Sequence, residues 1–333
     1  MAAFDAVLLL SFGGPEGPDD VMPFLENVLR GRNVPEERKL EVAKHYMSFG
    51  GKSPINDQNR AIIAALRTEL DAHGPTLPIY FGNRNWHPML ADTLQKMADD
   101  GVRNALAFAT SAYSSYSGCR QYREDIAKAR GVVGERAPHV EKIRAFFNHP
   151  LFIESVYEHA LEASANVPAG SRLVFTAHSI PTSMASGCDY EAQLKEAARL
   201  VTEKLGETEF DLVYQSRSGP PSVPWLGPDI LDHLRVLYAS NAKGAVVTPI
   251  GFVSDHMEVV YDLDHEAKAL AQELGLPFAR AKTAGTNPKF IQMLRELIAE
   301  RVDGAERRSL GVLGARADQC APDCCPAPVR PAR

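Results

Sequence analysis

The alternation of short apolar segments with longer amphipathic ones constrains the fold of this chain most. The apolar segments lack polar interruptions, which is typical of strands that are covered on both faces and are therefore parallel. Six segments have this character: Ala6–Ser11, Pro78–Gly82, Asn104–Thr110, Arg172–Ala177, Phe210–Gln215 and Gly244–Pro249. Helical patterns lie between or after them, at Pro18–Leu29, Asn59–Leu70, Tyr190–Lys204 and Asn287–Val302. The alternation predicts an α/β fold with doubly wound parallel sheets.

Two segments of similar pattern, Val7–Pro15 and Leu173–Pro181, suggest that the chain contains two similar halves. Each consists of an apolar strand, small polar residues and a proline. The length of 333 residues also exceeds what a single core usually occupies. We therefore expect an N-terminal half over residues 1–160 and a C-terminal half over residues 161–310. Residues 311–333, which are rich in Ala, Pro, Arg and Cys, are expected to form a C-terminal tail that needs an external tie to be ordered.

Charge and hydropathy limit the kinds of partner that the chain can bind. It has 42 acidic and 36 basic residues, which gives a net charge of −6, and it has no long basic run. This balance argues against nucleic acid as a partner. The longest early apolar run, Val7 to Leu10, is too short for a signal sequence or a membrane span. We expect a cytoplasmic protein without membrane insertion.

One histidine lies where an apolar strand ends. His178 follows the predicted strand Arg172–Ala177, and Pro181 prevents that strand from continuing in the middle of a sheet. Open α/β sheets bind ligands at the carboxyl ends of their strands. An imidazole there could ligate a metal or accept a proton near neutral pH, or it could be a hydrogen-bonded structural histidine.

Three acidic residues recur at helical spacing. Glu258, Asp262 and Glu266 would share one face of a helix, and no Lys or Arg lies between them to offset their repulsion. Such carboxylates suit a divalent cation that passes from one oxygen ligand to the next. Two alternatives stay open. Asp255 and Glu258 also fit a capping box, and the acids could form a solvated helix face.

The five cysteines are unevenly placed. Cys320, Cys324 and Cys325 lie close together in the tail, and the odd total argues against a disulfide framework. A fourth thiol from Cys119 or Cys188 would complete a four-thiolate site, which suits zinc or an iron–sulfur cluster equally well by ligand count. The alternative is a flexible, oxidisable tail.

A series of motifs, taken in order, resembles the ferrochelatase family, the enzymes that insert ferrous iron into a porphyrin. The motifs are LLLSFGGP at Leu8–Pro15, FGGKSPIN at Phe49–Asn56, RNWHP at Arg84–Pro88, TAHSIP at Thr176–Pro181, PWLGPD at Pro224–Asp229 and GFVSDHMEVVYDLD at Gly251–Asp264. They extend over nearly the full chain. The resemblance implies a metal-inserting lyase of haem biosynthesis, with two Rossmann-like halves that face a central porphyrin cleft.

The resemblance also implies the residues of the catalytic centre. His178 and Glu258 would be the facing catalytic pair and would bind the metal. Asp262 and Glu266 would continue the metal-binding ladder, on a helix with a widened π turn. His178 would accept a pyrrole proton, and Fe²⁺ would be the substrate metal.

Porphyrin contacts follow from the same matching. The expected residues are Ser53, Tyr122, Arg30, Tyr46 and Phe12. Phe12 occupies a position that is a tyrosine in some relatives, and here it has no hydroxyl with which to ligate iron. The sequence is most like the bacterial branch that metallates coproporphyrin III, with protoporphyrin IX as the second candidate.

The tail resembles that of relatives that carry a [2Fe–2S] cluster. The implied ligands are Cys119, Cys320, Cys324 and Cys325, with Cys119 preferred to Cys188 as the internal ligand. A downstream haem-pathway enzyme stays open as a partner. Two functions of other classes compete: a non-catalytic haem or metal carrier, and a nicotinamide-dependent oxidoreductase, although the glycine-rich turn after the first strand lacks the G-x-G-x-x-G order.

Overall fold

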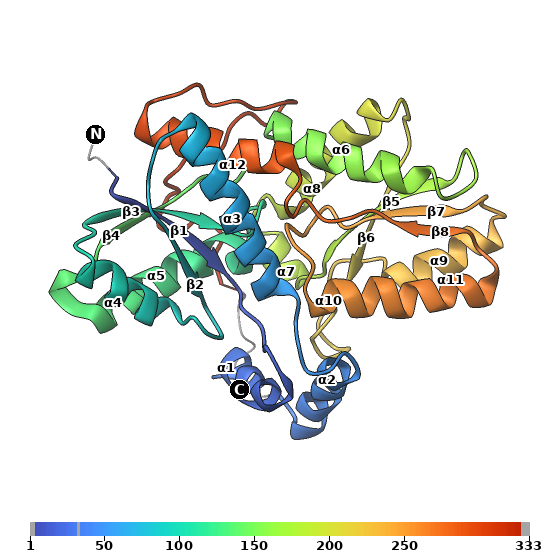
Figure 1. The fold of residues 1–333 in the computed structure, drawn as a ribbon. Helices are drawn as coiled ribbons and strands as arrows, with labels where there is room; N and C mark the ends of the chain where they lie inside the picture. Colours follow the sequence, from blue (N-terminus) through green and yellow to red (C-terminus); the bar gives the residue numbers. More distant parts are fainter. Residues whose placement is uncertain (1–3, 32–33, 328–333) are drawn as a thin grey trace. The chain divides into compact units, whose positions relative to one another are not determined.

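The computed structural model describes residues 4–31 and 34–327, which form two compact units (Figure 1). The first unit runs to Thr110 and adds Tyr122–Ile143 and Ser254–Met257. The second contains Ser111–Gln121, Arg144–Val253 and the chain from Glu258 onward. The predicted boundaries at residues 160 and 310 stay predictions. The last six residues of the predicted tail lie outside the described residues.

The first unit contains a parallel sheet with the strand order β2-β1-β3-β4. Its strands are β1 (Ala6–Ser11), β2 (Ile79–Asn83), β3 (Asn104–Ala109) and β4 (His139–Lys142). Its helices are α1 (Val21–Leu29), α2 (Glu36–Ser48), α3 (Ile55–His73), α4 (Leu90–Asp99) and α5 (Gln121–Val133), with short 3₁₀ helices η1 (Pro18–Asp20) and η3 (Gly134–Arg136). Buried side chains of α4 and α5 pack against alternate residues of β1 and β3. Every residue of β1 is buried, as expected for a strand covered on both faces.

The second unit repeats this plan with the strand order β6-β5-β7-β8. Its strands are β5 (Arg172–His178), β6 (Asp211–Gln215), β7 (Ala245–Thr248) and β8 (Phe278–Arg280). Its helices are α6 (Pro150–Ser164), α7 (Thr182–Ala185), α8 (Tyr190–Lys204), α9 (Ile230–Ala239), α10 (Met257–Val259), α11 (Lys268–Leu274) and α12 (Pro288–Val302), with π helices η2 (Tyr116–Arg120) and η4 (Val260–Ala267). Within this unit, α9 and α11 lie on one side of the sheet and α6 on the other (Figure 1).

The predicted fold class is confirmed, since both sheets are parallel and alternate with helices. All six predicted strands are present, and the equal strand order of the two sheets supports the prediction of two similar halves. The edge strands β4 and β8 were not predicted. Their sequences, HVEK and FAR, are short and carry charged side chains, whereas the other two edge strands, β2 and β6, each contain three consecutive apolar residues and were predicted.

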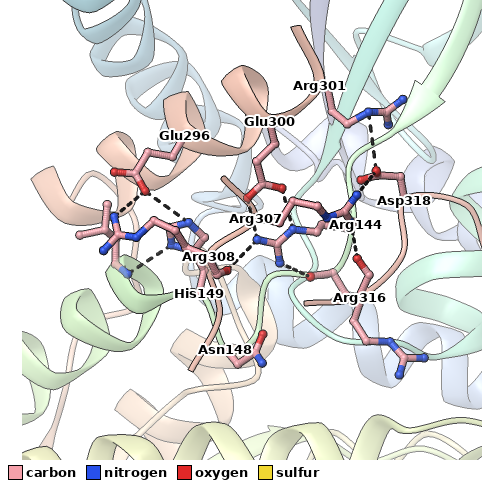
Figure 2. A network of polar contacts seen from close by, with 12 residues as sticks. Arg144, Asn148, His149, Glu296, Glu300, Arg301, Arg307, Arg308, Arg316 and Asp318 are labelled. Atoms are coloured by element: carbon pink, nitrogen blue, oxygen red, sulfur yellow. Dashed lines mark hydrogen bonds and ion pairs between the residues drawn. The ribbon is translucent and has the colours of Figure 1, made fainter. Parts of the chain in front are cut away.

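The chain after α12 is tied to the second unit by a polar network (Figure 2). The buried guanidinium of Arg144 makes a two-pronged ion pair with Glu300, and its Nη2 also donates to the carbonyl oxygen of Arg308 at 2.9 Å. Nδ2 of Asn148 donates to the carbonyl oxygens of Leu310 and Gly314 at 3.0 and 2.9 Å. Gly314 lies in the predicted tail, and its contact with Asn148 holds that part of the tail on the second unit. Within the described residues, none of the helices combines the length and apolar character that a bilayer crossing requires.

Candidate active site

The predicted catalytic pair lies at the carboxyl edge of the second sheet. Strand β5 is flanked by β6 on one side and β7 on the other, so the connections from these strands leave in opposite directions. Open α/β sheets bind ligands at such a point. His178 is the last residue of β5, and Glu258 lies in α10, the first helix after β7. The two side chains therefore follow the two strand ends that border this point.

The pair is in contact and open to solvent. Nε2 of His178 lies 3.6 Å from Oε2 of Glu258, and the two side chains are 32% and 47% exposed. The other ring nitrogen, Nδ1, hydrogen-bonds the carbonyl oxygen of Ser179. Because a carbonyl oxygen only accepts, Nδ1 carries the proton, and Nε2 of the neutral ring presents its lone pair toward Glu258. In the neutral ring, Nε2 can accept a proton, which the Glu258 carboxylate would stabilise, or bind a metal ion.

The surroundings of His178 favour its charged form. Burial by itself lowers the pKa of the imidazole, but the Glu258 carboxylate and the Ser179 carbonyl outweigh that effect, so that the pKa lies above its ordinary value. The charge of Asp262 acts in the same direction. A raised pKa makes Nε2 a stronger proton acceptor.

Asp262 follows Glu258 along the chain, in the π helix η4. Its Oδ2 accepts a hydrogen bond from the hydroxyl of Ser216 and another from Nε2 of Gln215 at 3.3 Å. The same Nε2 donates to the carbonyl oxygen of Glu258 at 3.1 Å. Burial raises the pKa of Asp262 to about 7, and the charges of Glu258 and Glu266 add to the effect while the Ser216 hydroxyl opposes it. Asp262 can therefore take up or release a proton near neutral pH.

Glu266 completes the predicted ladder in the same π helix. It is partly buried, and burial together with the charge of Asp229 raises its pKa. A π helix forms i→i+5 hydrogen bonds, so residues four and five apart lie close to one face. The π turn implied by the family resemblance is thus confirmed.

The two alternative roles of the acids do not match this geometry. In a capping box, Glu258 would accept the backbone N–H of Asp255. That N–H donates to Oε1 of Gln58 at 2.7 Å, and the Glu258 carboxylate lies beside His178 instead. A solvated helix face would leave Asp262 exposed, whereas it is partly buried.

In the first unit, one arginine lies over the rings of two of the predicted porphyrin residues. Phe12 follows β1, its ring is 38% exposed, and it makes an edge contact with Phe24. The guanidinium carbon of Arg84 lies 5.7 Å from the ring centroid of Phe12 and 4.7 Å from that of Tyr122. Nε of Arg84 donates to Asp125 at 2.5 Å, which fixes the guanidinium in place.

The other predicted porphyrin residues have different surroundings. Tyr46 packs edge-on against Phe24 at 5.7 Å, so it belongs to the same aromatic group as Phe12. Ser53 is buried, and its N–H donates to the carbonyl oxygen of Pro15. Arg30 is exposed at the end of α1, where its Nη2 donates to Asn27. The structure therefore groups Phe12, Tyr46 and Tyr122 by ring contacts. It places Ser53 and Arg30 apart from those contacts within the described residues.

Three residues that contact the predicted site were missed as candidates. Gln215 and Ser216 hold Asp262, and Arg84 lies over the rings of Phe12 and Tyr122. A usable signal was present, because Gln215 ends β6, Ser216 follows it, and Arg84 follows β2. All three lie at the carboxyl edges of the sheets, where His178 was found.

The thiols of the predicted cluster site lie together in the second unit. Cys119 is buried in η2, and a hydrogen bond with it, together with burial, raises the pKa of the Cys320 thiol. Sγ of Cys324 lies 3.6 Å from Sγ of Cys325. Burial, a hydrogen bond with Cys324 and the charges of the other thiols raise the pKa of Cys325. Each thiolate charge would repel its neighbours, so the four thiols behave as one interacting group.

Cys188 lies on the rim of this group. It lines a cavity of about 350 Å³ together with Cys324, Cys325, Asp189 and Asp323, and its thiol donates to the carbonyl oxygen of Met184 at 3.3 Å. Among residues 4–31 and 34–327, no set of three or more His, Cys, Asp or Glu side chains converges on a single metal ion.

Comparisons with known proteins agree over most of the chain. Residues 4–302 match the family model described as ferrochelatase. A protein of Rhodopirellula baltica named ferrochelatase is 57% identical over 327 residues, covering 97% of this chain and 93% of that protein. Proteins of Nocardia farcinica and Streptomyces coelicolor, both named coproporphyrin III ferrochelatase, are 54% and 51% identical. These alignments cover 99% and 97% of this chain and 99% and 94% of the two relatives.

One solved structure shows the same fold at low sequence identity. SirB from Bacillus subtilis with Fe³⁺ superposes with a TM-score of 0.56 at 13% identity, covering 90% of this chain and 97% of that one. The likeness supports a fold with two doubly wound halves.

Proposed function

The chain belongs to the ferrochelatase family, and we propose that it inserts Fe²⁺ into coproporphyrin III in haem biosynthesis. The contact between His178 and Glu258 carries the proposal, because it places a proton acceptor and a metal-binding carboxylate 3.6 Å apart at the ligand edge of a sheet. The relatives named coproporphyrin III ferrochelatase support the choice of porphyrin. A non-catalytic carrier would not require such a pair.

Metal insertion requires two pyrrole protons to leave the porphyrin while Fe²⁺ loses water. We assign Nε2 of His178 as the acceptor of a pyrrole proton, because Nδ1 is already protonated against Ser179 and the raised pKa of His178 strengthens its lone pair. Glu258 offers Fe²⁺ an oxygen ligand beside this nitrogen. Asp262, whose pKa is about 7, and Glu266 then relay the proton from His178 toward solvent, so that Nε2 of His178 can accept the second pyrrole proton.

The porphyrin is proposed to bind through residues of the first unit. The exposed ring of Phe12 and the partly exposed Tyr46 offer apolar surface for a flat macrocycle, and the buried Tyr122 contacts Arg84, which also lies over Phe12. Arg30 offers an exposed guanidinium for a propionate group. Ser53 completes the proposed set, and Phe12 supplies no oxygen ligand to iron.

The cysteine group fits a [2Fe–2S] cluster better than a single metal ion. Each iron of such a cluster takes two protein ligands, so four thiols need not converge on one point. Cys119, Cys320, Cys324 and Cys325 are mutually interacting thiols, and the raised pKa values of Cys320 and Cys325 reflect a cost of thiolate charge that bound iron would offset. When bound, the cluster supplies a one-electron centre and a link between the tail and η2. The cytoplasmic location, the lack of membrane insertion and the downstream haem-pathway partner stay predictions.

The test is a steady-state comparison of coproporphyrin III and protoporphyrin IX as iron acceptors under anaerobic conditions. Coproporphyrin III has four propionates and protoporphyrin IX has two. One lost charged hydrogen bond of about 1.5 kcal/mol would lower kcat/KM about tenfold. We expect kcat/KM to be at least about tenfold higher for coproporphyrin III. Equal or reversed values would indicate protoporphyrin IX as the substrate, and no acceleration with either porphyrin would indicate a carrier.

A further inference from the structure

A short segment links the proposed catalytic histidine to the cysteine-containing tail. Residues 182–190 follow the end of β5 and lead into α8. At the far end of this segment, the hydroxyl of Tyr190 donates to the backbone carbonyl oxygen of His178 at 3.1 Å. This carbonyl is partly buried, and a side chain twelve residues further along the chain donates to it. The position of His178 therefore depends on where Tyr190 is held.

The ring of Tyr190 is fixed by packing against other aromatic rings. It is buried, it is the first residue of α8, and its ring meets that of Tyr113 edge-on at 6.1 Å with an interplanar angle of 87°. The ring of Tyr113 packs in turn against Phe147 and Phe152. Since this packing restricts the ring, a shift of the backbone before Tyr190 would move its hydroxyl relative to His178.

The tail contacts the three residues that precede Tyr190. A Cβ atom added to Gly187 would lie 2.9 Å from Cγ of Pro326, so the tail packs directly on the glycine backbone. Cys188 shares its cavity with Cys324 and Cys325. Asp189 forms an ion pair with Arg316 at 2.8 Å. The tail residues that make these contacts lie both before and after Cys320 in the sequence. A change in the position of the whole tail would therefore shift residues 187–189.

We propose that Tyr190 is a positioning residue that holds His178 through its backbone carbonyl, and that the cysteine-containing tail fixes Tyr190 by packing on residues 187–189. This proposal rests on the proposed function. It gives the tail a mechanical role in iron insertion that requires no electron transfer. A small displacement of a catalytic group lowers the rate of the chemical step while leaving substrate binding largely intact, so the role should appear in kcat and not in KM.

Tyr190→Phe tests the first part, with Tyr113→Phe as its matched control. Both changes remove one buried hydroxyl that donates to a backbone carbonyl, at His178 for Tyr190 and at Ile250 (3.0 Å) for Tyr113. Both variants are made in the full chain and assayed with Fe²⁺ and coproporphyrin III. We expect Tyr190→Phe to lower kcat about fivefold with KM unchanged, and Tyr113→Phe to change kcat less than about twofold. The melting temperatures of the two variants should fall by similar amounts.

Equal kcat values for the two variants would overturn the proposal, and so would a loss that appears only in KM. The outcome is separable from the proposed function. If the wild-type protein inserts no iron into either porphyrin, the proposed function fails. If the wild type is active but the two variants are alike, only the role of Tyr190 fails.

Gly187→Ala tests the second part, because the new methyl group displaces Pro326 without altering any cysteine or His178. Gly131→Ala, where a Cβ meets nothing within 4 Å, is its control. Hydrogen exchange of the peptides covering residues 178–190 should speed up in Gly187→Ala and stay unchanged in Gly131→Ala, while the visible absorbance of the purified protein monitors any cluster. In the Tyr190→Phe background, Gly187→Ala should lower kcat little further. Fully additive losses, or unchanged exchange, would overturn the link between the tail and His178.

Discussion

The two sheets share one strand order, yet the segments that follow their central strands differ in chemistry. After β1 come Phe12, Gly13 and Gly14, and a Cβ on Gly14 would lie 2.6 Å from Cβ of Ser53. The backbone there is packed so closely that only glycine fits, and no titratable group follows the strand directly. Strand β5 ends with His178, which Ser179 follows, and a hydrogen bond with the Ser179 carbonyl oxygen fixes the titratable ring.

The difference indicates that the two units, which share one strand order, have different roles. A glycine-rich strand end with neighbouring aromatic rings suits contact with a flat ligand. A strand end with an imidazole and acidic side chains suits proton transfer and metal binding. We therefore expect variants in the second unit to lower kcat and variants in the first unit to raise KM for the porphyrin.

The largest effect is expected for His178→Ala. Loss of the proton acceptor should lower kcat about 10²- to 10⁴-fold, the usual contribution of a positioned acid or base. Porphyrin binding, measured by fluorescence titration, should change less than about threefold because the ring contacts lie in the first unit. Retained turnover would show that another group accepts the proton. A matching loss of porphyrin affinity would break the division between the two units.

Glu258→Gln should lower kcat about 100-fold at saturating Fe²⁺, since an amide is a poorer ligand for the cation than a carboxylate. It should also move the acidic limb of the pH–rate profile to lower pH, because the Glu258 charge helps to raise the pKa of His178. Asp264→Asn is the matched control. It removes the same charge from the same helical segment, but Asp264 pairs with Arg280. A similar kcat loss in both variants would indicate a general effect of helix charge.

A second contrast, between central and edge strands, explains which strands could be predicted from the sequence. Central strands such as β1 and β5 are buried along nearly their whole length, so their apolar runs are visible without any structure. The edge strands β4 and β8 carry charged residues and leave no such pattern. His178 was recognisable because it directly follows an apolar run and lies within a family motif.

Residues whose contacts depend on how neighbouring strands pair could not be found from the sequence in the same way. Gln215 reaches Asp262 because it pairs with His178 across β5 and β6, and that pairing is a property of the sheet. Arg84 meets two aromatic rings that are 72 and 38 residues away in the chain, as its own contacts show. Sequence pattern gives the strand ends, whereas the contacts between neighbouring strand ends require the folded chain.

Arg84→Leu should raise KM for the porphyrin about fivefold with kcat retained. The guanidinium lies over the rings of Phe12 and Tyr122, and a cation–π contact of about 1 kcal/mol corresponds to that factor. Asp125→Asn is the control, because it removes the charge of the ion pair while the amide oxygen can still accept the Nε hydrogen bond that holds the Arg84 guanidinium. Steady-state kinetics with varied porphyrin gives both constants. An equal KM rise in Asp125→Asn would mean that the ion pair, and not the ring contact, is responsible.

The last effect concerns stability and not the reaction rate, and it tests whether Asp262 in the second unit titrates near pH 7. Folded Asp262 keeps its proton up to a pH of about 7, whereas the unfolded chain loses it near the ordinary pKa of about 3.9. Between these values the folded state binds more protons, so the free energy of unfolding falls as pH rises from about 4 to 7. Asp262→Asn has no such proton to lose, and its stability relative to wild type should rise by about 3 kcal/mol across this window. Urea unfolding of metal-free protein at several pH values measures the difference. Parallel curves for the two proteins would mean that Asp262 is already charged at pH 5, and it would then act as a fixed metal ligand rather than as a proton relay.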